Sequence, residues 1–208
     1  MCRLFLANHR GWLFPVEFNL LLSGVRRHTV TDKHRCFWIW RLARYIASKE
    51  GEIAEVGVFK GGTARIIARS CPNKKVHLFD TFAGMPDVNR AIDLHRNNDF
   101  SKTSLEFARE LLADCGNVVF HPGVFPATAK AVEALRFCFV HIDVDIYTST
   151  RDCLEFFYEK MRPSGIMVFD DYEGEGCPGV KKAVDEFFKD KPEKPIITEQ
   201  YQCAVIKL

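Results

Sequence analysis

The feature that most constrains this chain is a repeated alternation of short apolar segments with helical segments. From residue 51 onward, apolar runs typical of buried strands are separated by stretches whose apolar residues recur at helical spacing. We predict five such strands, at 53–58, 76–79, 118–121, 137–142 and 166–169. Alternation of this kind produces parallel strands joined by right-handed crossovers, with helices on both faces of the sheet. The sequence therefore predicts a Rossmann-like α/β fold.

Helices are expected between and before these strands. Thr31 is the expected N-cap of a long amphipathic helix, and residues 20–22 suggest a shorter one that ends near Gly24. The other predicted helices are 63–70, 103–113, 128–134, 150–161 and 180–189. A hairpin of two strands, 195–198 and 202–206, is expected to close the chain. We interpret residues 1–208 as one domain, with a helical lid region at 1–50 and the Rossmann-like core at 51–208.

Composition excludes several classes of function. The formal net charge is +2, and no basic block or stripe is present, so nucleic acid is not expected as a partner. The 8 cysteines show neither CxxC nor zinc-finger spacing, which favours free thiols in a reducing compartment. The apolar stretch at 4–6 is interrupted too early for a signal-peptide core, and no run reaches the length of a membrane helix. We expect a cytoplasmic protein with no membrane partner.

Acidic residues follow three of the predicted strands. Asp80 comes after the second strand, Asp143 and Asp145 after the fourth, and Asp170 and Asp171 after the fifth. Ligands of open α/β sheets bind beyond the carboxyl ends of the strands, so these side chains should meet at the ligand site. Clustered carboxylates form the hard, oxygen-rich environment that suits Mg²⁺. Capping of a helix or pairing with a lysine is the ordinary role of an isolated aspartate, but this grouping favours a metal site.

A glycine-rich turn follows the first predicted strand, in the segment EVGVFKGGT at 55–63. Its glycines let a ligand approach the backbone, and the helix start offers free N–H groups. The spacing differs from the G-x-G-x-x-G of dinucleotide sites, which weakens a nicotinamide interpretation. Asp80, at the end of the next strand, is placed to accept hydrogen bonds from both ribose hydroxyls of a nucleoside. Together these features favour a cofactor that contains adenosine.

Several segments, taken together, resemble the macrocin O-methyltransferase family. They occur in the same order and at similar intervals over roughly residues 31–208: EVGVFKGGTA, HLFDTFAGMPD, DFSKTS, HPGVFPAT, HIDVDIYTST and FDDYEGEGCPGVKKAVDEF. The resemblance implies a class I enzyme that transfers a methyl group from S-adenosylmethionine to a sugar hydroxyl of a natural product. It also implies a seven-stranded sheet whose last strand is antiparallel.

The resemblance implies a set of cofactor-binding residues. They are Glu55, Gly57, Gly61, Asp80, Thr81, Phe82, Ser101, Gly123, Val124 and Asp143. The first three would hold the methionine part of the cofactor and Asp80 its ribose. Two assignments have ordinary structural alternatives: Ser101 is equally suited to cap the following helix, and Gly123 and Val124 to form a plain turn.

The resemblance also implies a metal site, and the residue two positions beyond its first ligand is a candidate base. Asp143, Asp170 and Asp171 would hold Mg²⁺ or a similar cation, and Asp145 is the candidate base. An ordinary aspartate, with a pKa of ~3.9, is a weak base for an alcohol. A cation that lowers the pKa of the hydroxyl makes such a base sufficient.

Other residues are assigned weaker roles. His141 is expected to be buried and satisfied within its strand, and His121 is a second, less favoured base. Residues 177–179, Cys-Pro-Gly, are expected to form a turn and helix start, and the aromatic residues at 37–40 to be core. Two other functions stay open: a nicotinamide-dependent oxidoreductase and a non-catalytic cofactor-binding protein. The acceptor is expected to be a hydroxylated small molecule, and the resemblance suggests a homodimer or a higher homo-oligomer.

Overall fold

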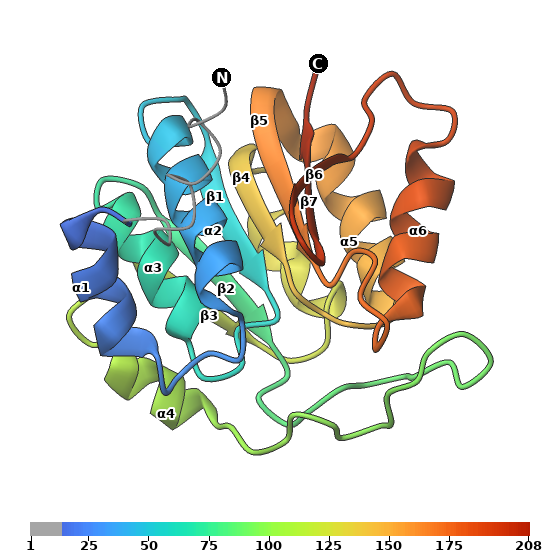
Figure 1. The fold of residues 1–208 in the computed structure, drawn as a ribbon, viewed down its shortest axis with the longest axis horizontal. Coiled ribbons are helices and arrows are strands. Elements are labelled where there is room, and N and C mark those ends of the chain that lie inside the picture. Colours follow the sequence, from blue (N-terminus) through green and yellow to red (C-terminus); the bar gives the residue numbers. More distant parts are fainter. Residues whose placement is uncertain (1–13) are drawn as a thin grey trace, which may run out of the picture.

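The computed structural model describes residues 14–208 and places a seven-stranded sheet at the centre of the molecule (Figure 1). The strand order is β3-β2-β1-β4-β5-β7-β6. The strands are β1 (Glu52–Val56), β2 (Val76–Asp80), β3 (Val118–Pro122), β4 (Phe137–Ile142), β5 (Met161–Asp170), β6 (Ile196–Glu199) and β7 (Gln202–Ile206). β1 to β5 pair in parallel, whereas β7 runs antiparallel to both β5 and β6. The predicted Rossmann-like sheet with an antiparallel last strand is therefore confirmed.

Helices cover both faces of this sheet (Figure 1). α1 (Val16–Val25), α2 (Lys33–Ile46) and α3 (Gly62–Ser70) lie on one face, and α5 (Tyr147–Phe157) and α6 (Pro178–Phe188) on the other. The remaining elements are α4 (Leu105–Leu111) and two short 3-10 helices, η1 (Ala127–Val132) and η2 (Tyr158–Lys160). The two layers follow from the alternation of side chains along each strand. In β4, for example, Phe139 packs with the α2 side and Val140 with the α5 side, and both are fully buried.

The structure differs from the sequence prediction in four local details: two helix caps, the type of one helix and the start of one strand. Asp32, not Thr31, caps α2, because its carboxylate accepts the backbone N–H groups of His34 and Arg35 at 2.8 and 3.2 Å. Ser104 caps α4 through the N–H of Phe107 at 3.1 Å, so Ser101 is not the cap. The segment predicted as a helix at 128–134 forms the 3-10 helix η1. β5 begins at Met161, ahead of a Pro-Ser-Gly segment whose turn-like composition hides the start of the strand.

The predictions about the cysteines and about membrane or signal segments can be compared with the structure only within residues 14–208. The apolar stretch at 4–6 and Cys2 lie outside the described residues. All seven cysteines within 14–208 are free, as predicted, and all seven are buried. No helix in the described part of the chain combines the length and the apolar character needed to cross a bilayer.

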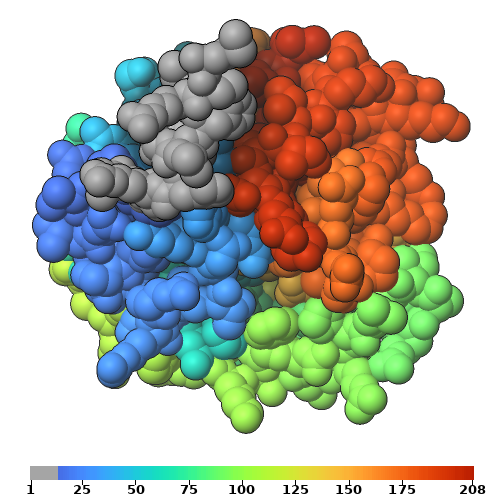
Figure 2. All heavy atoms as spheres, viewed as in Figure 1, coloured from blue at the N-terminus to red at the C-terminus, as the bar shows by residue number. Residues whose placement is uncertain are grey.

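The segment that joins β2 to α4 crosses the carboxyl-terminal edge of the sheet. In Figures 1 and 2 it is the green stretch along the lower edge, next to the α6 region. Its two arms are tied by backbone hydrogen bonds between Met85 and Asp99 (2.9 Å) and between Asn98 and Met85 (3.0 Å). Its middle is anchored by the buried Asp93, whose Oδ1 accepts the N–H of Tyr147 at the start of α5 at 2.9 Å. We call residues 81–104 the crossing loop.

Candidate active site

A cavity of about 320 Å³ opens at the carboxyl ends of the parallel strands, beneath the crossing loop. It is the position at which sheets of this topology bind ligands. Seven of the predicted cofactor, metal and base residues line it: Gly57, Asp80, Thr81, Gly123, Asp143, Asp145 and Asp171. Its apolar wall includes Phe59, Met85 and Phe125. The cavity therefore combines an apolar wall with a concentrated set of carboxylates.

The glycine-rich turn after β1 approaches the backbone of the neighbouring strand so closely that no side chain fits. Gly57 has φ = +90°, and a Cβ atom there would lie 1.8 Å from the carbonyl oxygen of Asp143. Backbone hydrogen bonds fix the same place, from Gly57 N–H to the Phe79 carbonyl and from Asp143 N–H to the Val56 carbonyl, each 2.9 Å long. The glycine therefore allows the carboxyl ends of β1 and β4 to lie in close contact.

Substitution of Gly57 tests this close approach. Gly57→Ala must move the Asp143 backbone and impose a positive φ on alanine, so we expect the free energy of unfolding to fall by at least 1–3 kcal/mol, roughly the cost of overpacking. Urea unfolding measures the loss. Gly116→Ala is the matched control, since a Cβ at Gly116 meets nothing within 4 Å. Equal stability of the two variants would contradict the argument.

Asp80 organises the glycine-rich turn from the end of β2. Its Oδ2 accepts the N–H groups of Val58 and Phe59, both at 2.7 Å, and its Oδ1 accepts that of Phe82 at 2.6 Å. Burial raises the pKa of Asp80, and these three hydrogen bonds oppose that increase because they favour the charged form. The carboxylate thus fixes the shape of the turn, and Oδ1 keeps a lone pair for a further donor in the cavity.

Three carboxylates meet on the cavity wall. Oxygen atoms of Asp143, Asp145 and Asp171 lie within 4.8 Å of one another. Asp145 and Asp171 both have φ = 60°, a left-handed conformation that costs energy and is concentrated at functional sites. Burial and the neighbouring carboxylates, Asp170 first among them, raise the pKa of Asp143 well above its usual range. Burial and the Asp171 carboxylate raise the pKa of Asp145 to about 8. The cluster therefore has more negative charge than its surroundings neutralise.

Asp170 lies behind this cluster, on the α2 face of the sheet. It is 1% exposed, and its Oδ1 accepts a hydrogen bond from Gln202 Nε2 at 2.6 Å. Its Oδ2 is 3.6 Å from His141 Nε2, and the other ring nitrogen of His141 is 2.8 Å from Glu55 Oε1. The predicted ligands Asp143, Asp170 and Asp171 do not form one such cluster among the described residues. Asp143 instead belongs to two sets, one with Asp145 and Asp171 and one with His141 and Asp170.

The buried Glu55–His141–Asp170 set is an ion triad. Burial opposes a charge on the imidazole, but the carboxylates of Asp170 and Glu55 outweigh it and hold the pKa of His141 well above its usual range. In return, His141 and Arg35 overcome the effect of burial and keep the pKa of Asp170 below its usual value. The side chains of Glu55 and His141 are fully buried. His141 is therefore buried, as the sequence predicted, and its Nδ1 is paired with Glu55. The prediction that it is fully satisfied holds only in part, because Nε2 lies 3.6 Å from Asp170, beyond hydrogen-bonding distance.

The remaining predicted cofactor residues lie away from the cavity wall. Gly61 faces the side chains of Leu111 and Leu112 at the end of α4. Phe82 packs against the hydrophobic core on the α2 face, and the side chains of Ser101 and Val124 are exposed.

His121, the second candidate base, stacks on Phe79 with ring centroids 4.5 Å apart. Its Nε2 lies within hydrogen-bonding distance, 3.0 Å, of His77 Nδ1.

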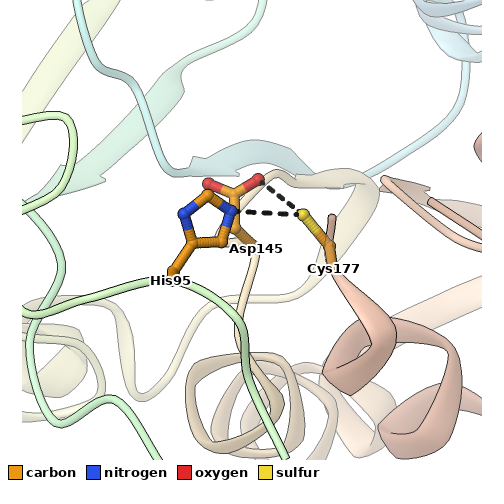
Figure 3. A group of neighbouring side chains, drawn as sticks. All are labelled: His95, Asp145 and Cys177. Atoms are coloured by element: carbon orange, nitrogen blue, oxygen red, sulfur yellow. Dashed lines mark hydrogen bonds between the residues drawn. The ribbon is translucent and has the colours of Figure 1, made fainter. Parts of the chain in front are cut away.

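Three cavity residues escaped the sequence reasoning. Arg35 of α2 reaches Asp171 Oδ1 at 3.2 Å and brings a positive charge to the edge of the acidic cluster. His95 of the crossing loop and Cys177 before α6 lie beside Asp145 (Figure 3). Arg35 lies within a helix whose pattern otherwise indicates only packing. Cys177 precedes the first residue of α6, as its sequence context predicts, and it also lines the cavity.

The sheet order, the reversed β7 and a cavity at the carboxyl ends of the strands define a Rossmann-like fold of the class I methyltransferase type. The family model described as Macrocin-O-methyltransferase (TylF) matches residues 27–206. The chain belongs to this family.

Individual relatives agree with this assignment. The chain is 31% identical over 143 residues to an 8-demethyl-8-(2,3-dimethoxy-alpha-L-rhamnosyl)-tetracenomycin-C 4'-O-methyltransferase of Streptomyces olivaceus, covering 61% of this chain and 55% of the relative. It is 32% identical over 155 residues to a demethyldecarbamoylnovobiocin O-methyltransferase of Streptomyces niveus, covering 66% and 58%. The chain thus spans a little over half the length of these relatives. Among solved structures, the O-methyltransferase NovP superposes with a TM-score of 0.75 at 27% identity, over 86% of this chain and 82% of that one.

Proposed function

We propose that the protein transfers a methyl group from S-adenosylmethionine to a hydroxyl of a sugar-containing small molecule, with the assistance of a divalent cation. The observation that carries the proposal is the meeting of Asp143, Asp145 and Asp171 in a cavity that also contains Gly57 and Asp80. Membership of the macrocin O-methyltransferase family supports methyl transfer over the nicotinamide-dependent alternative. The two relatives named above act on sugar-bearing or natural-product substrates, which supports the acceptor class.

The cavity residues fit an adenosine-containing methyl donor. Gly57 leaves the backbone bare where a ligand must approach it, and Asp80 keeps an acceptor lone pair on the cavity side. Phe125 and Met85 offer an apolar wall for a purine. When bound, S-adenosylmethionine supplies an electrophilic methyl group on a positively charged sulfur. The chain's part is to hold this group in line with an acceptor oxygen, which is a large source of rate acceleration.

The ligand type and the spacing of the acidic cluster suit a hard divalent cation. Carboxylate oxygens are the ligands that Mg²⁺ prefers, and here oxygens of Asp143, Asp145 and Asp171 lie within 4.8 Å of one another. The raised pKa values of Asp143 and Asp145 reflect burial and mutual repulsion, which a bound cation would relieve. We propose Asp143 and Asp171 as the ligands that face the cavity, with Asp170 held behind them by His141. When bound, Mg²⁺ supplies positive charge that lowers the pKa of a nearby alcohol.

Asp145 is the proposed proton acceptor. A pKa of about 8 makes its carboxylate a stronger base than an exposed aspartate. The carboxylate is held by a left-handed backbone at the cavity wall and accepts a hydrogen bond from the Cys177 thiol at 3.6 Å. Asp145 would take the proton from the acceptor hydroxyl as the oxygen attacks the methyl carbon.

Mg²⁺ affinity should rise with pH. With a pKa of about 8, Asp145 keeps its proton near neutrality in the free protein, and the pKa of Asp143 is shifted in the same direction; a bound cation must displace such protons. We expect affinity to increase by up to about tenfold per pH unit for each displaced proton, and to level off above the pKa of about 8 for Asp145. Calorimetric titration with Mg²⁺ across this range measures the slope. The Asp145→Asn variant should show a shallower slope, and an affinity independent of pH in the wild type would contradict the proposal.

The proposed function is tested by incubating the protein with S-adenosylmethionine that carries a labelled methyl group, Mg²⁺ and a panel of rhamnosylated or otherwise sugar-bearing acceptors. Label transferred to an acceptor hydroxyl supports the proposal. Binding of the donor without transfer to any acceptor supports the non-catalytic alternative. The suggested self-association stays a prediction, and sedimentation velocity of the purified chain tests it independently of activity.

A further inference from the structure

A second group of metal-ligating side chains lies beside the acidic cluster. It joins three elements that are far apart in the sequence: His95 from the crossing loop, Asp145 from the turn after β4 and Cys177 from the start of α6 (Figure 3). One ligand atom from each lies within 4.8 Å of the other two, and all three residues line the cavity. Unlike the neighbouring carboxylates, this group offers one imidazole nitrogen, one sulfur and one oxygen.

The separations within the group match a tetrahedral ion. His95 Nε2 lies 3.5 Å from Cys177 Sγ, and Cys177 Sγ lies 3.6 Å from Asp145 Oδ1. In a tetrahedral zinc site, bonds of about 2.3 Å to sulfur and about 2.0 Å to nitrogen or oxygen place the ligand atoms about 3.5 Å apart. The two separations that involve Cys177 therefore match such a site, and the ligand atoms of His95 and Asp145 lie within 4.8 Å of each other.

The surrounding contacts hold the ligands in place. The other ring nitrogen of His95, Nδ1, is 3.1 Å from Asp99 Oδ2, an arrangement that orients metal-binding histidines and fixes the nitrogen available to the ion. Asp93, two residues before His95, pins the crossing loop to the N-terminus of α5 through the N–H of Tyr147 at 2.9 Å. It also packs so closely on α6 that a Cβ at Gly179 would lie 2.0 Å from Asp93 Oδ1. Because the buried Asp93 fixes the crossing loop against α5 and α6, His95 is held close to Cys177.

We propose that His95, Asp145 and Cys177 form a binding site for a transition-metal ion of the Zn²⁺ class, separate from the proposed Mg²⁺ ligands Asp143 and Asp171. Thiolate and imidazole ligands favour Zn²⁺ over Mg²⁺, whereas the all-carboxylate set favours Mg²⁺. On binding, the Cys177 thiol loses its proton to solvent and its sulfur becomes a ligand. Three protein ligands leave a fourth position open, and the cavity supplies the space for a water or ligand oxygen there.

The binding claim does not depend on methyl transfer, but one consequence rests on the proposed function. An ion at this site engages Asp145 and so withdraws the proposed proton acceptor. The two ideas are separable, because metal binding is measured on the protein alone, without methyl donor or acceptor.

Titration of the purified, reduced full chain with Co²⁺, a spectroscopic substitute for Zn²⁺, tests the proposal. We expect one equivalent to produce a thiolate-to-cobalt charge-transfer band together with the visible bands of a tetrahedral ion, and Zn²⁺ to displace it. Cys177→Ser should lose the charge-transfer band. Asp99→Asn should keep the band but bind Co²⁺ roughly 10–100-fold more weakly, the usual effect of removing a carboxylate behind a histidine ligand.

Cys115→Ser is the matched control. Cys115 is also buried and its Sγ also lies near a carboxylate, 3.7 Å from Asp114 Oδ1, but no histidine belongs to that pair. This variant should retain the wild-type spectrum. Circular dichroism and thermal unfolding establish that each variant is folded. A wild-type spectrum without a charge-transfer band, or a band that survives Cys177→Ser, would overturn the proposal.

Discussion

Asp145→Asn should lower kcat for methyl transfer by roughly 10²–10⁴-fold, the usual contribution of a positioned general base. Asparagine has the same shape as aspartate but accepts no proton, so the cavity should keep its form while the proposed proton acceptor is lost. Asp145 contacts the Cys177 thiol and the acidic cluster rather than the glycine-rich turn, which Asp80 holds. The affinity for S-adenosylmethionine should therefore change little.

Steady-state rates with a labelled methyl donor measure this effect, and calorimetry measures the affinity for the donor. Asp190→Asn, the same change at an exposed position outside the cavity, is the control and should leave both values unchanged. An Asp145→Asn enzyme with wild-type kcat would show that another group takes the proton. Parallel loss of cofactor binding would instead show that Asp145 positions the donor.

His141→Phe should reduce the free energy of unfolding by about 3–5 kcal/mol, the usual cost of removing one partner from a buried ion pair. His141 lies between the carboxylates of Glu55 and Asp170, and its side chain is fully buried. Phenylalanine fills the volume with a slightly larger aromatic ring but leaves two buried carboxylates without their shared cation. Urea unfolding measures the loss. His34→Phe is the matched control, because the side chain of His34 is 50% exposed and its ring nitrogen Nδ1 lies 3.8 Å from Glu199 Oε2. We expect a change within about 0.5 kcal/mol for this variant.

The stabilisation by this triad should depend on pH in two directions. The raised pKa of His141 provides stability that is complete below its unfolded value of ~6.5 and is lost as the pH rises through the folded pKa. The lowered pKa of Asp170 provides stability that is present above its unfolded value of ~3.9 and is lost as the pH falls through the folded pKa. The difference between wild type and His141→Phe should therefore be largest between these two unfolded values. A difference that does not vary with pH would contradict the ion triad.

The sheet and the position of the site were predictable because strand endings carry a strong signal. Apolar runs that end in Asp80, Asp143 and Asp170 locate the carboxyl edge of a parallel sheet, and all three lie at that edge. The direction in which each acidic side chain points was harder to predict from the sequence. Successive side chains at the end of a strand point to opposite sides, so Asp170 and Asp171 face different environments: Asp170 turns toward His141 and Gln202, and Asp171 lines the cavity.

Residues that reach the cavity from distant segments were not predictable. His95 and Cys177 are 82 positions apart, and their contact depends on how the crossing loop is pinned to α5 and α6. Glu55 could have been placed more accurately, because it lies opposite His141 in the register of β1 and β4. An acid and a histidine on adjacent buried strands favour pairing with each other, and this pairing places Glu55 beneath the site.

The most direct test of the account is calorimetric titration of the wild-type chain with S-adenosylmethionine, with and without Mg²⁺. Saturable binding of one equivalent is expected in both conditions, because hydrogen bonds to Asp80 hold the glycine-rich turn in shape without a cation. Absence of binding in either condition would contradict the proposed methyl donor and leave the carboxylate cavity without its central ligand.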